Sequence, residues 1–206
     1  ERYVSTGLYM SNNQRPSLRG VADIDLAQHE IRVIDELLSR ADSKVAYKTY
    51  PFGNRYVDPD PVVERAQAAE NIDVLTRRVD VRYMLSEFRL IVTARATSTF
   101  GWCLATGRPL LLLDHPDHVP FRDDLRELLS AGLFFVNLAS ESGFKDAREL
   151  LLMPADRLEA LWAAKSEARA RLVAELLGDL DGGSGRRTAE LLAGSAGSGS
   201  STAATK

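Results

Sequence analysis

Hydroxyl and cationic side chains gather where an apolar run ends and a helical pattern begins, in the segment Thr93-Ala94-Arg95-Ala96-Thr97-Ser98-Thr99-Phe100-Gly101. Ser98 or Thr99 can cap that helix, and the first backbone N–H groups of a helix can bind an anion. Thr97 adds a hydroxyl, and Arg95 can add a charge-assisted hydrogen bond. The segment therefore predicts a phosphate site, and helix capping alone is the alternative.

A second cationic group lies in the short strand pattern Val45-Ala46-Tyr47-Lys48-Thr49-Tyr50, which Pro51 ends. A lysine inside a strand built for burial needs a partner for its ammonium group. A phosphate and an acidic neighbour both stay open as that partner. Tyr50 is a candidate for stacking on a base, and packing at the rim of the core is the alternative.

Two further loops follow expected strands and carry polar side chains. Asn12 lies in the first loop, and Asp114 and His115 begin the segment Asp114-His115-Pro116-Asp117-His118. Pro116 argues against a regular metal scaffold and no third ligand cluster is visible, so we expect no metal site. Asn12, Asp114 and His115 are interpreted as contacts to a polar ligand, with solvated loops as the alternative.

Several catalytic motifs are missing from the sequence. It has no GxxxxGK[ST] motif, no GxGxxG motif and no GxSxG motif, which disfavours an NTPase, an ordinary dinucleotide site and a hydrolase elbow. Cys103 lies in an apolar helical pattern and is interpreted as a core residue. No carboxylate pair stands out, so the catalytic residues stay unknown.

The composition excludes further classes. The 206 residues carry 29 acidic and 26 basic side chains, a net charge of −3, which gives no support to nucleic acid or anionic lipid as a partner. A single cysteine excludes an internal disulfide framework. No apolar run reaches the length of about 18 residues that a membrane span needs. We expect a cytoplasmic location, with peripheral contact to the inner membrane face as an option.

Alternating strand and helix patterns predict a three-layer α/β/α sandwich with a parallel, Rossmann-like sheet of five or six strands. We expect one domain over 1–179 and a Gly/Ser-rich disordered tail over 180–206, interrupted by a short helix over 187–192. The first residue is Glu1, so we expect a fragment of a larger protein. A strand that enters a loop is predicted within 3–10. Further strands are predicted over 45–50, 72–75, 89–94, 109–114 and 133–138, and helices over 23–40, 61–70, 80–88, 98–106, 122–131, 144–152 and 155–177.

The order of these segments resembles the donor-binding, C-terminal half of a GT-B glycosyltransferase. Lys48, Tyr50 and Pro51 match one motif of that half, and Ser98 with Thr99 matches its phosphate-binding pair. More narrowly, the chain is similar to bacterial transferases of surface polysaccharides such as capsule and lipopolysaccharide, including Kdo-transferase and sialyltransferase-like enzymes. Tyr50 departs from the histidine that cytidine-sugar families usually have at its position.

The resemblance implies a glycosyltransferase fragment that binds a nucleotide sugar as substrate, with CMP-Kdo or a similar donor expected, and that uses no cofactor. It also implies two missing partners, an N-terminal Rossmann-like domain and a glycan acceptor, so the fragment alone is expected to be inactive. The alternatives are a polyol-phosphate (CDP-glycerol-type) transferase domain, which usually needs catalytic histidines, and a non-catalytic nucleotide- or sugar-binding module. Convergence of Lys48 with Ser98 and Thr99 on one cleft would favour a phosphorylated ligand.

Overall fold

Six parallel strands form one sheet in the order β3-β2-β1-β4-β5-β6 in the computed structural model of the chain. The structure describes residues 2–6, 23–49, 60–76, 79–94, 98–117 and 121–198. The strands are β1 (Arg2–Thr6), β2 (Lys44–Lys48), β3 (Ile72–Leu75), β4 (Leu90–Thr93), β5 (Leu110–Asp114) and β6 (Phe134–Asn137). Each predicted strand is present, and the predicted three-layer α/β class is confirmed.

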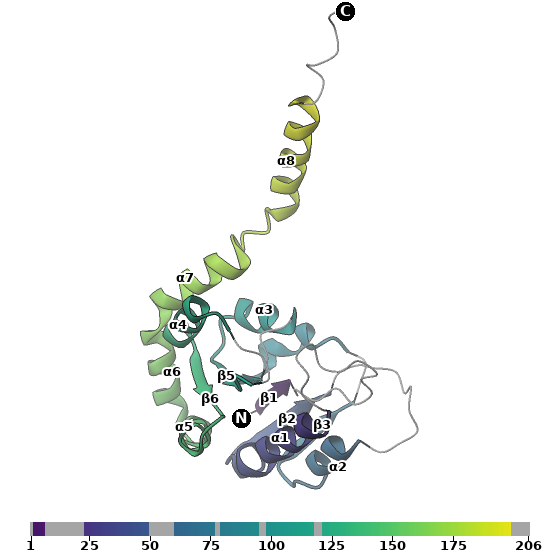
Figure 1. The fold of residues 1–206 in the computed structure, drawn as a ribbon, viewed down its shortest axis with the longest axis vertical. Coiled ribbons are helices and arrows are strands. Elements are labelled where there is room, and N and C mark those ends of the chain that lie inside the picture. Colours follow the sequence, from purple (N-terminus) through teal and green to yellow (C-terminus); the bar gives the residue numbers. More distant parts are fainter. Residues whose placement is uncertain are drawn as a thin grey trace, which may run out of the picture.

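Helices cover both faces of the sheet (Figure 1). Helices α1 (Asp23–Glu36), α2 (Pro61–Gln67) and α5 (Glu141–Leu151) lie on one face, and ion pairs from α1 to α5 join Arg32 to Glu141 and Glu36 to Arg148. We call this the α1 face. The opposite, α3 face carries α3 (Ser98–Ala105), α4 (Asp123–Gly132) and the 3₁₀ turns η2 (Val81–Tyr83) and η3 (Leu85–Glu87), with α7 (Ser166–Leu177) packed outside α3 and α4.

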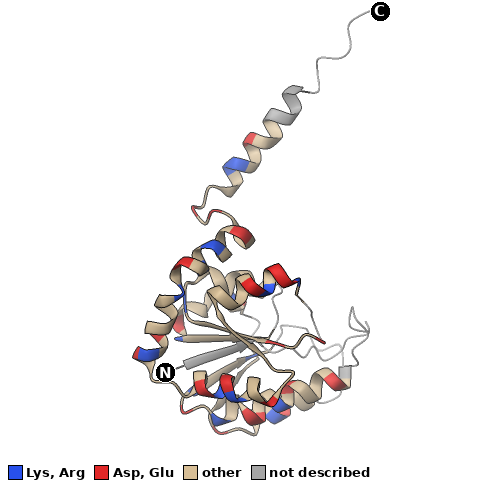
Figure 2. Cartoon of the chain, turned by 60° about the vertical axis from the view of Figure 1, so that its left-hand side comes forward, with Lys and Arg blue, Asp and Glu red and all other residues tan. Residues whose placement is uncertain are grey.

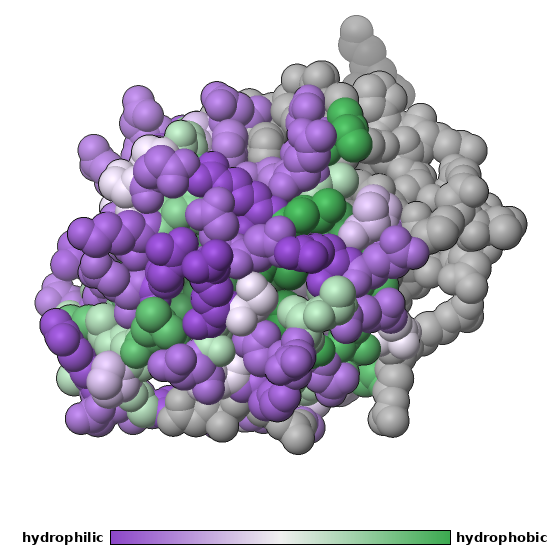
Figure 3. All heavy atoms as spheres, turned by 90° about the horizontal axis from the view of Figure 1, so that it is seen from below, coloured by the Kyte–Doolittle hydropathy of each residue, from purple (hydrophilic) through white to green (hydrophobic). Residues whose placement is uncertain are grey.

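The central strands are apolar because helices cover them on both sides. Every residue of β4 and of β5 is buried, as the run from Leu110 to Leu113 predicts. On the outer surface, acidic and basic residues alternate along the helices (Figure 2). Seen from below, hydrophobic residues show only as small areas between hydrophilic ones (Figure 3). The core therefore lies in the layers between the sheet and its helices.

Two predicted helices differ in the structure. The helix predicted over 80–88 forms η2 and η3 instead, because its backbone N–H groups bond three residues back, as Met84 does to Val81 (3.0 Å). The helix predicted over 155–177 is broken at Lys165 into α6 (Ala155–Ala164) and α7. The Lys165 ammonium donates to the carbonyl oxygens of Ser130 and Ala131 at the end of α4 (2.9 and 3.1 Å), which stabilises the break.

The C-terminal residues also differ from the prediction. The structure forms helix α8 (Ser184–Ser198), longer than the short helix expected within a disordered tail, and it extends away from the body in Figure 1. Leu191 and Leu192 on α8 are exposed. The division into a domain over 1–179 and a disordered tail over 180–206 stays a prediction. The remaining turn, η1 (Leu38–Arg40), closes α1.

Candidate functional site

Three strands end side by side at the carboxyl edge of the sheet. Lys48 on β2 is the Cα partner of Thr6 on β1, and Thr6 is the partner of Thr93 on β4. Two strand spacings therefore separate Lys48 from Thr93, about 10 Å between their Cα atoms. Residues in register on parallel strands point to the same face, so the side chains of Lys48 and Thr93 share the α3 face. The strand order reverses between β1 and β4, where ligands bind in open parallel sheets.

Lys48 is buried at this edge, with only 6% of its surface exposed. Its ammonium donates to the carbonyl oxygen of Thr49 (3.1 Å). Burial lowers the pKa of Lys48, and the carboxylate of Asp80 raises that pKa in part. An acidic neighbour, one of the two partners considered for Lys48, is therefore present. Asp80 itself caps η2 by accepting from the backbone of Arg82 (3.0 Å) and pairs with its guanidinium (3.3 Å).

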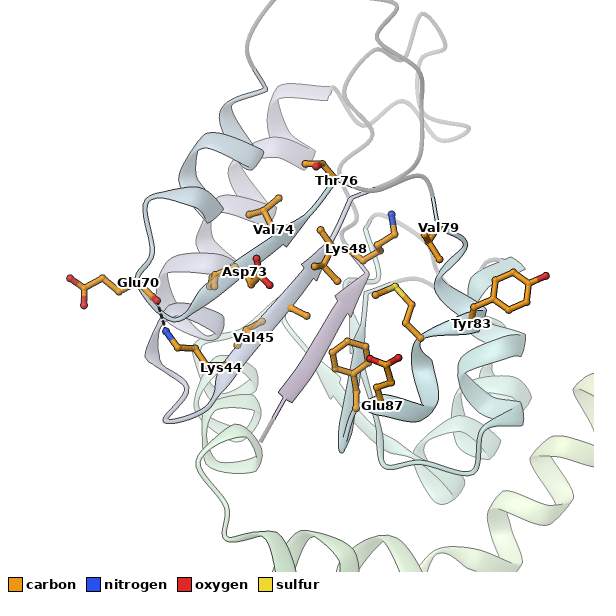
Figure 4. Close-up of a pocket in the computed structure, with 15 residues that line it drawn as sticks. Lys44, Val45, Lys48, Glu70, Asp73, Val74, Thr76, Val79, Tyr83 and Glu87 are labelled. Carbon is orange, nitrogen blue, oxygen red and sulfur yellow. Dashed lines mark hydrogen bonds between the residues drawn. The ribbon is translucent and has the colours of Figure 1, made fainter.

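A cavity of about 800 Å³ opens on the α3 face between the edge strand β3, its neighbour β2 and the turns η2 and η3 (Figure 4). Lys48, Thr76 and Val79 lie at its upper end in this view, and Lys44 lies at the opposite end. Its other lining residues are Val45, Ala46, Glu70, Ile72, Asp73, Val74, Leu75, Tyr83, Met84, Glu87 and Phe88. The sequence analysis identified only Lys48 in this cavity, because the rest come from separate segments without a motif.

The predicted phosphate segment lies where β4 passes into α3. Helix α3 begins at Ser98, and Thr99 in its first turn is half-buried. Arg95 and Thr97 lie outside the described residues, as do Tyr50, Pro51 and Asn12. The predicted strand before this segment and the predicted helix after it are therefore confirmed, whereas binding by Ser98 and Thr99 stays a prediction.

Asp114 and His115 point to opposite faces of the sheet. Asp114 is 2% exposed and pairs with Arg126 of α4 (2.7 Å) on the α3 face. Burial raises the pKa of Asp114, and Arg126 offsets part of that rise. His115 lies on the α1 face, with its ring 4.8 Å from the ring of His29. The two residues predicted to share a ligand loop therefore have different surroundings, and Asp114 has a structural partner.

The α1 face holds a polar contact that the sequence analysis missed. Glu30 is buried and accepts a hydrogen bond from the hydroxyl of Tyr47 on β2 (2.9 Å). Burial and the neighbouring Glu30 carboxylate hold the pKa of Tyr47 well above its usual range. A glutamate among the apolar positions of the first helix was the available signal. Among the described residues, no group of three or more His, Cys, Asp or Glu side chains could hold a metal ion.

No protein-family model matches the chain, and no curated protein matches it. Among solved structures, it is similar to the spinosyn forosaminyltransferase SpnP at 18% identity and a TM-score of 0.50, over 93% of this chain and 43% of SpnP. It is also similar to the spinosyn rhamnosyltransferase SpnG in complex with thymidine diphosphate (16% identity, TM-score 0.45, 84% of this chain and 42% of SpnG). A further match is the calicheamicin glycosyltransferase CalG4 (16% identity, TM-score 0.42, 87% of this chain and 43% of CalG4).

The chain has the Rossmann-like fold of GT-B glycosyltransferases. It spans less than half the length of the solved structures it matches. None of their names mentions a Kdo, sialic acid or polyol-phosphate donor, so these finer assignments are not shown. No helix in the described part of the chain is long and apolar enough to cross a membrane.

Proposed function

We propose that this chain is the donor-binding domain of a glycosyltransferase and binds a nucleotide sugar at the carboxyl edge of its sheet. The observation that carries the proposal is the buried ammonium of Lys48, which lies in the same register row as Thr93, the strand end before α3. A cation and a helix N-terminus on the two sides of the strand-order reversal suit a ligand with a phosphate between them.

The proposed chemistry is electrostatic. Transfer of the sugar leaves negative charge on the departing nucleotide, and a fixed cation in a site of low dielectric constant stabilises that charge. Lys48 would supply the cation, and the hydroxyls of Ser98 and Thr99 would supply hydrogen-bond donors together with the backbone N–H groups at the start of α3. The acceptor and the general base would come from outside this chain.

The donor in the finer proposal is CMP-Kdo or a similar CMP-linked sugar, used for a bacterial surface polysaccharide. This assignment depends on the resemblance of Lys48, Tyr50 and Pro51 to those transferases, and the solved structures give it no support. A comparison of nucleotides decides it, because each base identifies a class of donor.

Calorimetric titration of the chain with CMP, CDP, UDP, dTDP, GDP and ADP tests the proposal. We expect saturable binding of at least one nucleotide, and preference for CMP would support the finer assignment. Lys48→Ala and Ser98→Ala should each weaken the binding by about 1–3 kcal/mol, the range for lost charged or buried hydrogen bonds.

The matched control is Lys145→Ala, because Lys145 is exposed on α5, on the opposite face of the sheet, and pairs with Glu149 at 3.9 Å. It should leave the affinity unchanged. Unchanged affinity in both Lys48→Ala and Ser98→Ala would contradict the site, and no binding of any nucleotide would contradict the function.

A further inference from the structure

The cavity below Lys48 contains two carboxylates that face it from opposite sides. Asp73 projects from β3, and Glu87 projects from η3 (Figure 4). Neither carboxylate forms an ion pair with a residue that the structure describes, although Lys44 lines the same cavity. Lys44 instead donates to the carbonyl oxygen of Glu70 (2.8 Å). The cavity therefore presents carboxylate acceptors that form no ion pair within the described part of the chain.

The residue beside Asp73 on the sheet is small. Ala46 on β2 is the Cα partner of Asp73, and their side chains share the α3 face. A methyl group next to the carboxylate leaves room for a ligand to approach it along the sheet surface. The next pair on the same face toward the carboxyl edge is Lys48 and Leu75, so Lys48 lies two residues beyond the position of Asp73 along the strands.

Much of the remaining wall is apolar, and Lys44, Glu70, Thr76 and Tyr83 add polar groups to it. Leu75, Met84 and Phe88 line the cavity, and Phe88 is only 2% exposed. A thioether and apolar side chains suit the faces of a flat aromatic ring, while carboxylates suit polar groups on its edge. Flat apolar surface, acceptors at the edge and a cation at the upper end are the features that a nucleoside phosphate would require.

Building on the proposed function, we infer that this cavity holds the base of the donor nucleotide and that Asp73 selects a base with an exocyclic amino group. A carboxylate only accepts hydrogen bonds, and the amino group of cytosine donates them. Uracil and thymine carry a carbonyl oxygen at the same position, which a carboxylate repels. The phosphates would then lie above the base, between Lys48 and the start of α3.

CDP and UDP provide the test, because both carry the same ribose and diphosphate and differ at this position of the base. We expect the chain to bind CDP at least about 10-fold more tightly than UDP, as sites that hydrogen-bond one edge group discriminate strongly against its absence. Asp73→Asn should bring the two dissociation constants close together, because an amide can both accept and donate. Asp73 is exposed, so this variant should fold normally.

Asp146→Asn is the control, because Asp146 is an exposed carboxylate on α5, on the other face of the sheet. It should leave the ratio of CDP to UDP affinity unchanged. Ala46→Leu should weaken both nucleotides, since its side chain would enter the space beside Asp73.

The outcomes separate this inference from the proposed function. If CDP and UDP bind equally and Asp73→Asn changes neither, or if UDP binds more tightly, the assignment of the base is overturned while nucleotide binding stands. If neither CDP nor UDP binds and no other nucleotide does, the proposed function itself fails, and the inference fails with it.

Discussion

The α3 face of the sheet is closed over one half and open over the other. Over β4, β5 and β6, helices α3 and α4 cover the strands and α7 packs outside them. Over β2 and β3, the described elements that approach the sheet on this face are η2 and η3, and the 800 Å³ cavity lies between them and the strands. Among the residues whose burial is described, Asp114 is the buried charged group of the closed half and Lys48 that of the open half. Asp114 is paired with Arg126 within the fold, whereas Lys48 borders a space that a ligand can fill.

Breaking the ion pair of the closed half should have the largest effect on stability. Arg126→Met leaves Asp114 buried without that partner, which costs about 3–5 kcal/mol at neutral pH. The pKa of Asp114 is already raised and rises further without Arg126, so the charged form is the unstable one. The loss should therefore shrink as the pH falls toward about 4 and Asp114 takes up a proton.

Denaturant titrations at neutral and acid pH measure this difference. Arg122→Met is the matched control, because Arg122 pairs with Asp124 on the surface of the same helix. The control should change the stability little at either pH, because water and salt screen an exposed ion pair. An equal loss in both variants would contradict the structural role of the Asp114–Arg126 pair.

Larger side chains should destabilise the closed half more than the open half. A Cβ atom at Gly132 on α4 would lie 3.2 Å from the Cα atom of Arg169 on α7, so Gly132→Val should cost about 1–3 kcal/mol. Ala46→Val adds volume into the open cavity and should cost less than about 1 kcal/mol. Thermal unfolding compares the two variants, and a larger loss in Ala46→Val would show that the open half is as tightly packed as the closed one.

Removing the charge of Lys48 in the open half should not destabilise the fold, in contrast to the loss of Arg126 in the closed half. Burial lowers the pKa of Lys48, so the folded state disfavours its charged form. We expect Lys48→Met to leave the free energy of unfolding unchanged or to raise it by up to about 1 kcal/mol, while nucleotide binding weakens. Denaturant titration and calorimetry on the same variant check both parts, and a clear destabilisation would contradict them.

The smallest expected effect is a change of stability and of nucleotide affinity with pH. Because the pKa of Lys48 is lowered in the folded chain, wild-type stability should receive a contribution that rises with pH from the folded-state pKa to the unfolded one. Nucleotide affinity should fall over the same alkaline range, as the ammonium loses its proton. Lys48→Arg keeps its charge and should remove the fall in affinity, and calorimetry from neutral to alkaline pH measures both chains.

Much of the fold could be predicted because its signals are local. The run from Leu110 to Leu113, the helix start expected at Ser98 or Thr99 and Pro61 at another helix start each depend on neighbouring residues, and the structure places β5, α3 and α2 there. The turns at 81–87 were harder, because Val81, Leu85 and Phe88 have the spacing of a helix while their backbone forms 3₁₀ bonds.

The candidate site was less predictable because its residues are distant in sequence. Lys48 was unusual within its own strand, but Asp73 and Glu87 resemble ordinary surface carboxylates until β3 and η3 bring them to one cavity. The separation of Asp114 from His115 follows from the alternation of side chains along β5. The sequence alone does not identify the residues that contact them on the two faces, which are Arg126 for Asp114 and His29 for His115.

The two tryptophans of the chain lie in contrasting places. Trp162 is buried, and its indole N–H donates to the carbonyl oxygen of Gly107 (2.8 Å). Trp102 is 38% exposed and stacks with Arg82, the neighbour of the cavity residue Tyr83. Fluorescence can therefore separate two events in one sample: occupancy of the cavity should change the emission of Trp102, and loss of the fold should change that of Trp162. In a Trp102→Phe chain, the remaining emission of Trp162 would report unfolding alone. Subtracting the spectrum of this variant from that of the wild-type chain would give the emission of Trp102, which would report the ligand.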